Sequence, residues 1–164
     1  MEVHFLFKAG DKVVYPMQGI GIIEKFEEKI FSGQKKQYCI IKMLKNNMEI
    51  MIPTDRLSSS NIRMISDIKT LENILSHIQN NSQIQEDLTS KQRYQINMEK
   101  IKTGSLRDSA EVVYDLTLIN KQKSLNSSEK QILNTAKKLL IDEITLIKNI
   151  SEIEATNLLK STIN

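Results

Sequence analysis

The chain of 164 residues is long enough for one ordinary domain or two small ones. Its hydrophobic fraction of 40% suits a folded protein and is too high for a disordered chain. A single cysteine excludes an internal disulfide framework and favours a reducing compartment, so we expect a cytoplasmic protein. No run of about 18 apolar residues is present, so we expect no membrane span.

The net charge of +3 does not by itself indicate a nucleic-acid-binding protein, but the charge is unevenly distributed. Residues 91–138 hold ten Lys and Arg against five Asp and Glu, a net charge of +5, whereas residues 139–164 hold two against four. A basic block of this kind permits contact with phosphate groups. A solvated helix surface has the same composition, and charge alone favours that simpler reading.

The first sixty-odd residues have the pattern of short β-strands separated by turns. Ser32-Gly33 and Asn46-Asn47 are turn sequences, and the two prolines of the chain, Pro16 and Pro53, mark strand ends. Short strands at this spacing predict a small antiparallel sheet or barrel. The strand-like runs are residues 12–15, 19–26, 37–43 and 48–52.

From about Ser66 onward the apolar residues recur with a helical period. Ile68, Leu71 and Ile78 lie on one face of a first helix, and residues 80–87 are polar and are predicted to form a loop. A second helix carries Tyr94, which we expect in the core, and ends near Gly104; a third follows it. The change of period near residues 64–68 predicts a domain boundary there.

Two sequences predict the starts of the last two helices. Asn126 can cap a long helix, with Glu129 three residues further on near its positive end. Ser151-Glu-Ile-Glu154 matches a capping box that opens a final short helix. We therefore predict an α+β protein of two domains: a small antiparallel β-barrel over residues 1–66, then a compact bundle of about five helices over residues 67–164.

The sequence proposes no catalytic site. His4 and His77 are the only histidines, and Cys39 stands in an apolar strand where a buried, inert thiol is the simplest interpretation. No group of Cys and His has the spacing of a zinc site, and neither a dinucleotide-binding nor a phosphate-binding loop is present. We therefore expect no enzyme activity, no cofactor and no small-molecule substrate.

Several segments resemble the CarD/CdnL family of bacterial transcription regulators. Phe7-Lys-Ala-Gly-Asp-Lys-Val-Val-Tyr-Pro16 is similar to the family's opening, which the transcription-repair coupling factor shares. Gly33-Gln-Lys-Lys-Gln-Tyr38 and Met51-Ile-Pro53 are similar to its next hairpin and strand end, and Arg93-Tyr-Gln-Ile-Asn-Met-Glu-Lys100 to its helical segment. The resemblance extends over nearly the whole chain. Because the coupling factor has only the β module, the helical half separates this chain from it.

The resemblance implies a Tudor-like β domain that docks on the β subunit of bacterial RNA polymerase. It also implies a helical domain that touches promoter DNA at the upstream edge of the transcription bubble. Members of the family stabilise the open promoter complex, commonly at ribosomal RNA promoters, without a nucleotide or a metal. On this resemblance we expect a monomer that reaches the nucleoid through the polymerase.

The resemblance also assigns residues. Lys29 stands where the family carries a basic polymerase contact, Met51 where members carry arginine or methionine, and Pro53 matches the proline beside it. Strand alternation places Met51 on the face opposite Ile50 and Ile52, so it faces either the core or a partner.

On the DNA side, Ser90 replaces the tryptophan that many members wedge against the minor groove. The basic contacts implied by the resemblance are Arg93, which matches one of a basic pair, and Lys130 at the start of the long helix. Gln92 replaces the other member of the pair, and Lys91 can substitute for it. The alternative to a DNA contact is a polymerase-binding adaptor whose helical domain binds a second protein.

Overall fold

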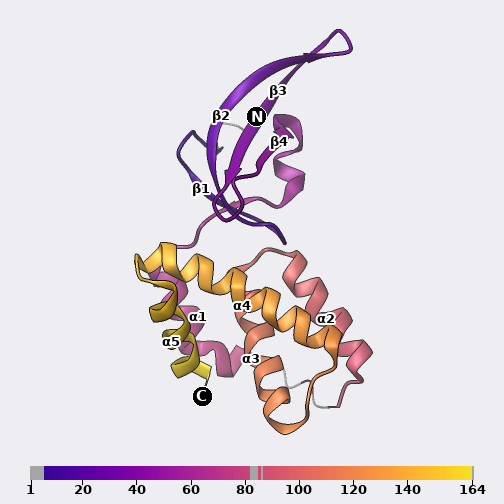
Figure 1. Cartoon of the computed structure of the whole chain (residues 1–164), viewed down its shortest axis with the longest axis vertical. Helices are drawn as coiled ribbons and strands as arrows, with labels where there is room; N and C mark the ends of the chain where they lie inside the picture. The colour runs from indigo at the N-terminus through magenta and orange to yellow at the C-terminus, as the bar shows by residue number, and fades with distance from the viewer. Residues whose placement is uncertain (1–5, 82–84, 86, 164) are drawn as a thin grey trace. The chain divides into compact units, whose positions relative to one another are not determined.

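The computed structural model describes residues 6–81, 85 and 87–163. The chain divides into two compact units, Met1–Ile65 and Ser66–Asn164. The first contains the strands, and the elements described in the second are all α-helices (Figure 1). The α+β, two-domain prediction, with a small antiparallel β domain before five helices, is confirmed.

The first unit is built on an open antiparallel sheet in the strand order β4-β3-β2-β1-β5. Among the described residues, β4 and β5 are therefore the edge strands. The short 3-10 turns η2 (Thr54–Arg56) and η3 (Ser58–Ser60) separate these two strands along the chain. The strands are β1 (Lys12–Tyr15), β2 (Gly19–Phe31), β3 (Gln34–Met43), β4 (Glu49–Pro53) and β5 (Arg63–Met64).

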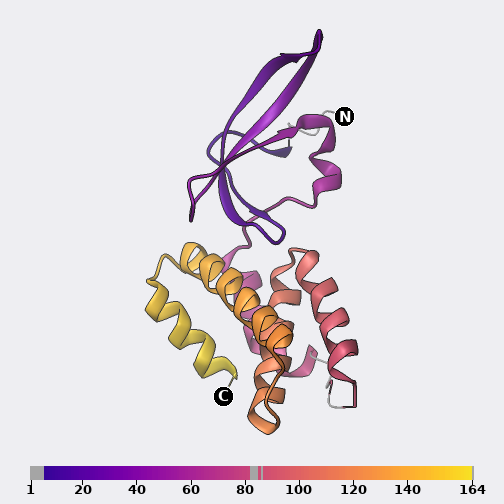
Figure 2. The same ribbon diagram turned by 45° about the vertical axis from the view of Figure 1, so that its right-hand side comes forward.

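The β2–β3 hairpin is longer than the sequence predicts, because both strands continue to the turn that joins them. Pairing runs from Gly21 opposite Met43 to Phe31 opposite Gln34, with a bulge between Ile23 and Lys25. Ser32 and Gly33 make the turn with φ of 51° and 76°, a left-handed conformation that glycine adopts without strain. In both views the tip of the hairpin extends well beyond the other strands of its sheet (Figures 1 and 2).

The main buried cluster of the β unit lies on one face of the sheet, whereas Val14, Ile20 and Ile40 are buried outside that cluster. Alternate residues of β3 and β4 point into it, and Leu57 and Ile62 from the chain after β4 pack against them. Phe26 and Tyr15 lie partly buried at its margin. Its buried members are Val13, Ile23, Cys39, Ile41, Met43, Ile52, Leu57 and Ile62.

The second unit contains α1 (Ile68–Asn81), α2 (Ser90–Lys102), α3 (Leu106–Gln122), α4 (Ser127–Lys148) and α5 (Glu152–Ile163). The Asn126 side chain accepts a hydrogen bond from the Glu129 amide, so the predicted cap of α4 is confirmed. The predicted capping box of α5 is also confirmed, because the Ser151 hydroxyl and the Glu154 carboxylate each accept a bond from the other residue's amide.

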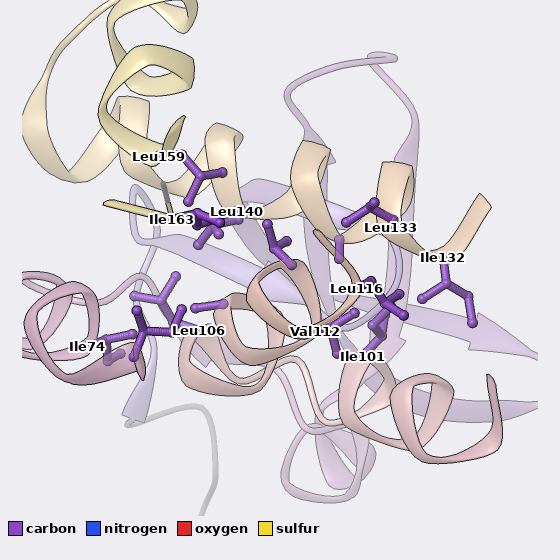
Figure 3. Close-up of a cluster of buried hydrophobic side chains, with 14 of the residues drawn as sticks. Ile74, Ile101, Leu106, Val112, Leu116, Ile132, Leu133, Leu140, Leu159 and Ile163 are labelled. Atoms are coloured by element: carbon purple, nitrogen blue, oxygen red, sulfur yellow. The ribbon is translucent and has the colours of Figure 1, made fainter. Parts of the chain in front are cut away.

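Isoleucine, leucine and valine from all five helices meet in one core (Figure 3). Leu116 of α3, Leu140 of α4 and Leu159 of α5 are among the buried members. Tyr94, which we expect in the core, is partly buried and packs against it from the edge. The helices are therefore held by a shared apolar interior, which fixes the positions of their first turns.

The predicted loop over residues 80–87 begins later than expected, but Gln85 has no regular structure and Asp87 lies in a turn. Asn80 and Asn81 belong to α1, and residues 82–84 and 86 lie outside the described residues. Gln85 is buried rather than solvent-exposed: its side-chain amide donates to Asn97 Oδ1 at 3.2 Å and to Asp115 Oδ2 at 3.3 Å. A polar sequence reads as a loop, but here one glutamine satisfies two buried polar groups.

Candidate functional site

One face of the sheet carries the three predicted polymerase contacts, Lys29, Met51 and Pro53, at different positions along the strands. Pro53 pairs with Tyr38 across β3–β4, and Met51 pairs with Ile40. Lys29 pairs with Lys36 across β2–β3. The β3 partners Lys36, Tyr38 and Ile40 lie on the face opposite the core residues Cys39 and Ile41, although Ile40 itself is buried, with 1% of its surface exposed.

Met51 is exposed, with 37% of its surface accessible, whereas Ile52 is buried and Ile50 packs against the core. Of the two orientations that strand alternation leaves open, the outward one is therefore the one adopted. Met51 also lies on β4, which is an edge strand of the sheet. A partner strand could pair with the free side of β4 while contacting Met51.

The same face carries three residues that the sequence reasoning did not single out: Phe31, Lys36 and Tyr38. The rings of Phe31 and Tyr38 meet edge to face, with centroids 5.8 Å apart and an interplanar angle of 86°. The turn at Ser32-Gly33 was the available signal. Extending the pairing outward from that turn would have placed all three beside Lys29.

In the helical unit, Arg93 and Glu129 form a buried ion pair that joins α2 to α4. Arg93 Nε donates to Glu129 Oε1 at 2.7 Å, and a terminal nitrogen donates to Oε2 at 3.1 Å. The other terminal nitrogen donates to the Leu88 carbonyl at 2.8 Å. The arginine side chain is 13% exposed and the glutamate side chain 1%. We call this arrangement the Arg93–Glu129 clasp.

The clasp brings together the first turns of two helices. Arg93 is the fourth residue of α2 and Glu129 the third of α4. Lys91 and Lys130 lie in or beside these turns, and both are exposed. Because the first amides of a helix have no partners within it and carry a partial positive charge, the two lysines stand beside two positive helix ends.

Arg93 thus differs from the other two predicted DNA contacts. Each of the three nitrogen atoms of its guanidinium donates a hydrogen bond within the protein. Lys91 and Lys130, in contrast, are exposed. Sequence reasoning missed this arrangement, since the pair spans 36 residues. The only available signal was the position of Glu129 near a helix start. The positive end of the helix dipole explains a glutamate there without any ion pair.

Ser90, which stands in place of the family's tryptophan, is exposed and lines a cavity of about 390 Å³. The cavity lies where α2 and α4 begin and α3 ends, and Arg93, Lys123 and Glu129 also line it. α2 itself starts with a complete capping box between Thr89 and Gln92. The start of α2 is therefore well formed without the large aromatic ring.

The remaining chemistry-bearing residues that the structure describes form no site. Burial raises the pKa of the Cys39 thiol to about 11, so the group is protonated and unreactive near neutral pH. The described residues hold no group of three His, Cys, Asp or Glu able to bind a metal ion. None of the described helices is both long enough and apolar enough to cross a membrane.

Comparison with known proteins identifies both units. Residues 7–66 match the CarD-like/TRCF RID domain and residues 73–160 match the CarD C-terminal domain. "Putative transcription factor YdeB" of Bacillus subtilis (strain 168) is 49% identical over 147 residues, which cover 90% of this chain and 95% of that protein. The structure of CdnLNt from Myxococcus xanthus is 41% identical and covers 36% of this chain and 83% of its own, with a TM-score of 0.32.

These matches define a two-module protein in which a RID-type β domain precedes a CarD-type helical domain. The chain belongs to the CarD/CdnL family of transcription factors. The family is one of transcription factors and is not a known enzyme family.

Proposed function

We propose that this transcription factor binds the β subunit of RNA polymerase through its β unit and contacts promoter DNA through its helical unit. The DNA contact lies at the upstream edge of the bubble and stabilises the open complex. The observation that carries the proposal is the placement of Lys29, Met51 and Pro53 on one outward sheet face that ends at an edge strand. The protein acts as a monomer in the cytoplasm.

On the polymerase side, β4 offers backbone groups and Met51 offers a flexible apolar side chain. Backbone pairing with an edge strand supplies affinity, and alternate side chains supply specificity. Methionine adapts its shape to an apolar partner surface. Lys29 adds a positive charge further along the same face, which favours an acidic partner surface.

On the DNA side, Lys91 and Lys130 bind backbone phosphates at the joined first turns of α2 and α4. Arg93 acts as a positioning residue, because its guanidinium is engaged with Glu129 and Leu88 and so fixes the spacing of the two turns. Such phosphate contacts position a protein on DNA without reading its sequence. Tethering by the polymerase makes a weak contact effective by raising the local DNA concentration.

Ser90 replaces the apolar wedge, so the contact depends on charge rather than on insertion between bases. The effect should therefore be sensitive to salt. Each phosphate contact contributes about 0.9 to the slope of log affinity against log salt concentration. Neutralising both lysines should thus lower the slope by about two.

The test is the lifetime of the open complex on a ribosomal RNA promoter with cognate polymerase, in a series of salt concentrations. Wild-type protein should lengthen the lifetime, and Lys91→Gln/Lys130→Gln should not. Lys102→Gln/Lys138→Gln is the matched control, because it removes two exposed lysines from the same helices at a distance from the clasp. This control should behave as the wild type does.

Polymerase binding is measured separately by co-purification and titration. Met51→Glu should weaken binding to polymerase, and Lys29→Glu should abolish the promoter effect. Undiminished stabilisation by Lys29→Glu would remove that residue from the interface. If both double variants lengthen the lifetime equally, the lysines do not contact DNA. If wild-type protein binds polymerase but leaves the lifetime unchanged, the helical unit serves a second protein and the chain is an adaptor.

A further inference from the structure

The outward side of the β2–β3 hairpin beyond β4 forms a continuous surface that we call the hairpin face. It consists of Glu27, Lys29, Phe31, Gln34, Lys36 and Tyr38, which pair across the two strands at every second position of the ladder. It is continuous with the Met51 and Pro53 positions, because Tyr38 lies directly opposite Pro53. The hairpin carries this face away from the rest of the sheet (Figures 1 and 2).

Two lysines lie directly opposite each other on the hairpin face. Lys29 pairs with Lys36, an arrangement that disfavours the free sheet because like charges meet across the strands. Lys29 Nζ is 3.9 Å from Glu27 Oε2, but the same carboxylate oxygen lies 3.6 Å from Lys25 Nζ. Lys36 has no ion pair among the described residues. At Lys36 the face thus has a positive charge with which no carboxylate among the described residues pairs.

An exposed aromatic pair borders the two lysines. Phe31 remains 54% exposed although its ring contacts Tyr38 edge to face. Aromatic side chains are enriched in the centres of protein interfaces, where burial of their large surface supplies binding energy. Two aromatic rings and two lysines on one face therefore favour a partner that is both acidic and apolar.

We propose that the hairpin face extends the polymerase contact of Lys29 to Phe31, Lys36 and Tyr38 and receives an extended acidic segment carrying one apolar side chain. A carboxylate of that segment lies between Lys29 and Lys36, and its apolar side chain packs on Phe31 and Tyr38. The inference rests on the proposed function, since a partner strand added at β4 would meet this surface next. A phosphate backbone suits the face less well, because Glu27 stands among its lysines.

The hairpin supplies a matched control for each variant. Lys35 and Ile30 pair with each other on the opposite side of the same hairpin, and both are exposed, Ile30 by 64%. Affinity for purified polymerase is measured by titration for Lys36→Glu against Lys35→Glu, and for Phe31→Ala against Ile30→Ala. Thermal unfolding of each variant establishes that the β unit is folded.

Lys36→Glu should weaken polymerase binding about tenfold and flatten its salt dependence, as expected for a charge at an interface. Phe31→Ala should weaken it about thirtyfold, as the loss of an aromatic anchor does. Lys35→Glu and Ile30→Ala should each change it by less than about twofold, because their side chains face away. Met51→Glu should weaken polymerase binding whether or not the hairpin face is a contact.

Equal effects of Lys35→Glu and Lys36→Glu would overturn the proposal, since net charge alone would then account for them. Wild-type affinity of both Lys36→Glu and Phe31→Ala would also overturn it. If Met51→Glu nevertheless weakens binding, the polymerase interface at β4 is retained and only the hairpin face is excluded from it. If Met51→Glu has no effect, the proposed interface at β4 is itself wrong. Loss of affinity for free duplex DNA in Lys36→Glu, with polymerase affinity kept, would assign the face to nucleic acid instead.

Discussion

Removing the arginine of the Arg93–Glu129 clasp should destabilise the helical unit strongly. Arg93→Met keeps most of the apolar volume but leaves the Glu129 carboxylate, 1% exposed, without its cation. It also deprives the Leu88 carbonyl of its donor. Breaking a buried ion pair by removing one partner costs about 3–5 kcal/mol. That is a large part of the total stability of roughly 5–15 kcal/mol expected of a protein domain.

Removing both charges should lower the stability of the helical unit far less than removing the arginine alone. Arg93→Met/Glu129→Leu replaces the pair with apolar side chains, a change that is often neutral or stabilising by about 1–4 kcal/mol. The double variant should therefore be more stable than Arg93→Met alone, although it carries one substitution more. The Glu129→Leu single variant completes the cycle, and a double variant that loses less stability than the sum of the two single variants shows that the two residues are coupled.

The measurement is urea unfolding followed by far-ultraviolet circular dichroism, which reports mainly on the five helices. With an m value of about 2 kcal/mol/M, a loss of 4 kcal/mol lowers the midpoint by about 2 M. Lys91→Met is the control on the same helical turn; its side chain is exposed, and the change should stay within about 0.5 kcal/mol. A loss of less than about 1 kcal/mol in Arg93→Met, or a double variant less stable than the single one, would refute the reasoning.

Three further variants or modifications test separate parts of the structure. Gly21→Ala should destabilise the β unit by about 1–3 kcal/mol, measured by thermal unfolding, because an added Cβ would lie 2.5 Å from Cγ2 of buried Ile41. Asn126→Ala should cost about 1 kcal/mol in urea unfolding, since the Glu129 amide loses its capping acceptor. Cys39, with a pKa near 11, should react with iodoacetamide at pH 8 roughly two hundredfold more slowly than an ordinary thiol, because far less thiolate is present. Unfolding in urea should abolish that difference.

The sequence predicts those features that depend on neighbouring residues. Alternation along residues 48–52 placed Met51 opposite Ile50 and Ile52, and the structure chooses between the two resulting orientations by burying Ile52. The caps at Asn126 and Ser151 followed from spacings of three residues, and both are present. Such features need no knowledge of the tertiary fold, because the partners lie within one turn of chain.

Features that depend on distant residues were not predictable in the same way. The clasp joins residues 36 apart, and the buried amide of Gln85 reaches Asp115, 30 residues further along the chain. All four of these residues have polar or charged side chains, which are expected at the surface when only the sequence is known. The length of the β2–β3 hairpin was underestimated because residues 27–36 are mostly charged or polar, although backbone pairing continues wherever the register allows it.

The modest charge of the chain is compatible with a DNA-binding role only if another protein brings it to the promoter. A net charge of +3 spread over 164 residues gives little general attraction to DNA. Under the proposed function, the hairpin face and Met51 supply partner affinity, whereas Lys91 and Lys130 act only once the promoter is near. Strengthening the phosphate contacts would raise affinity for every DNA site equally, so weak contacts held in register by the clasp confine the effect to DNA already held by polymerase.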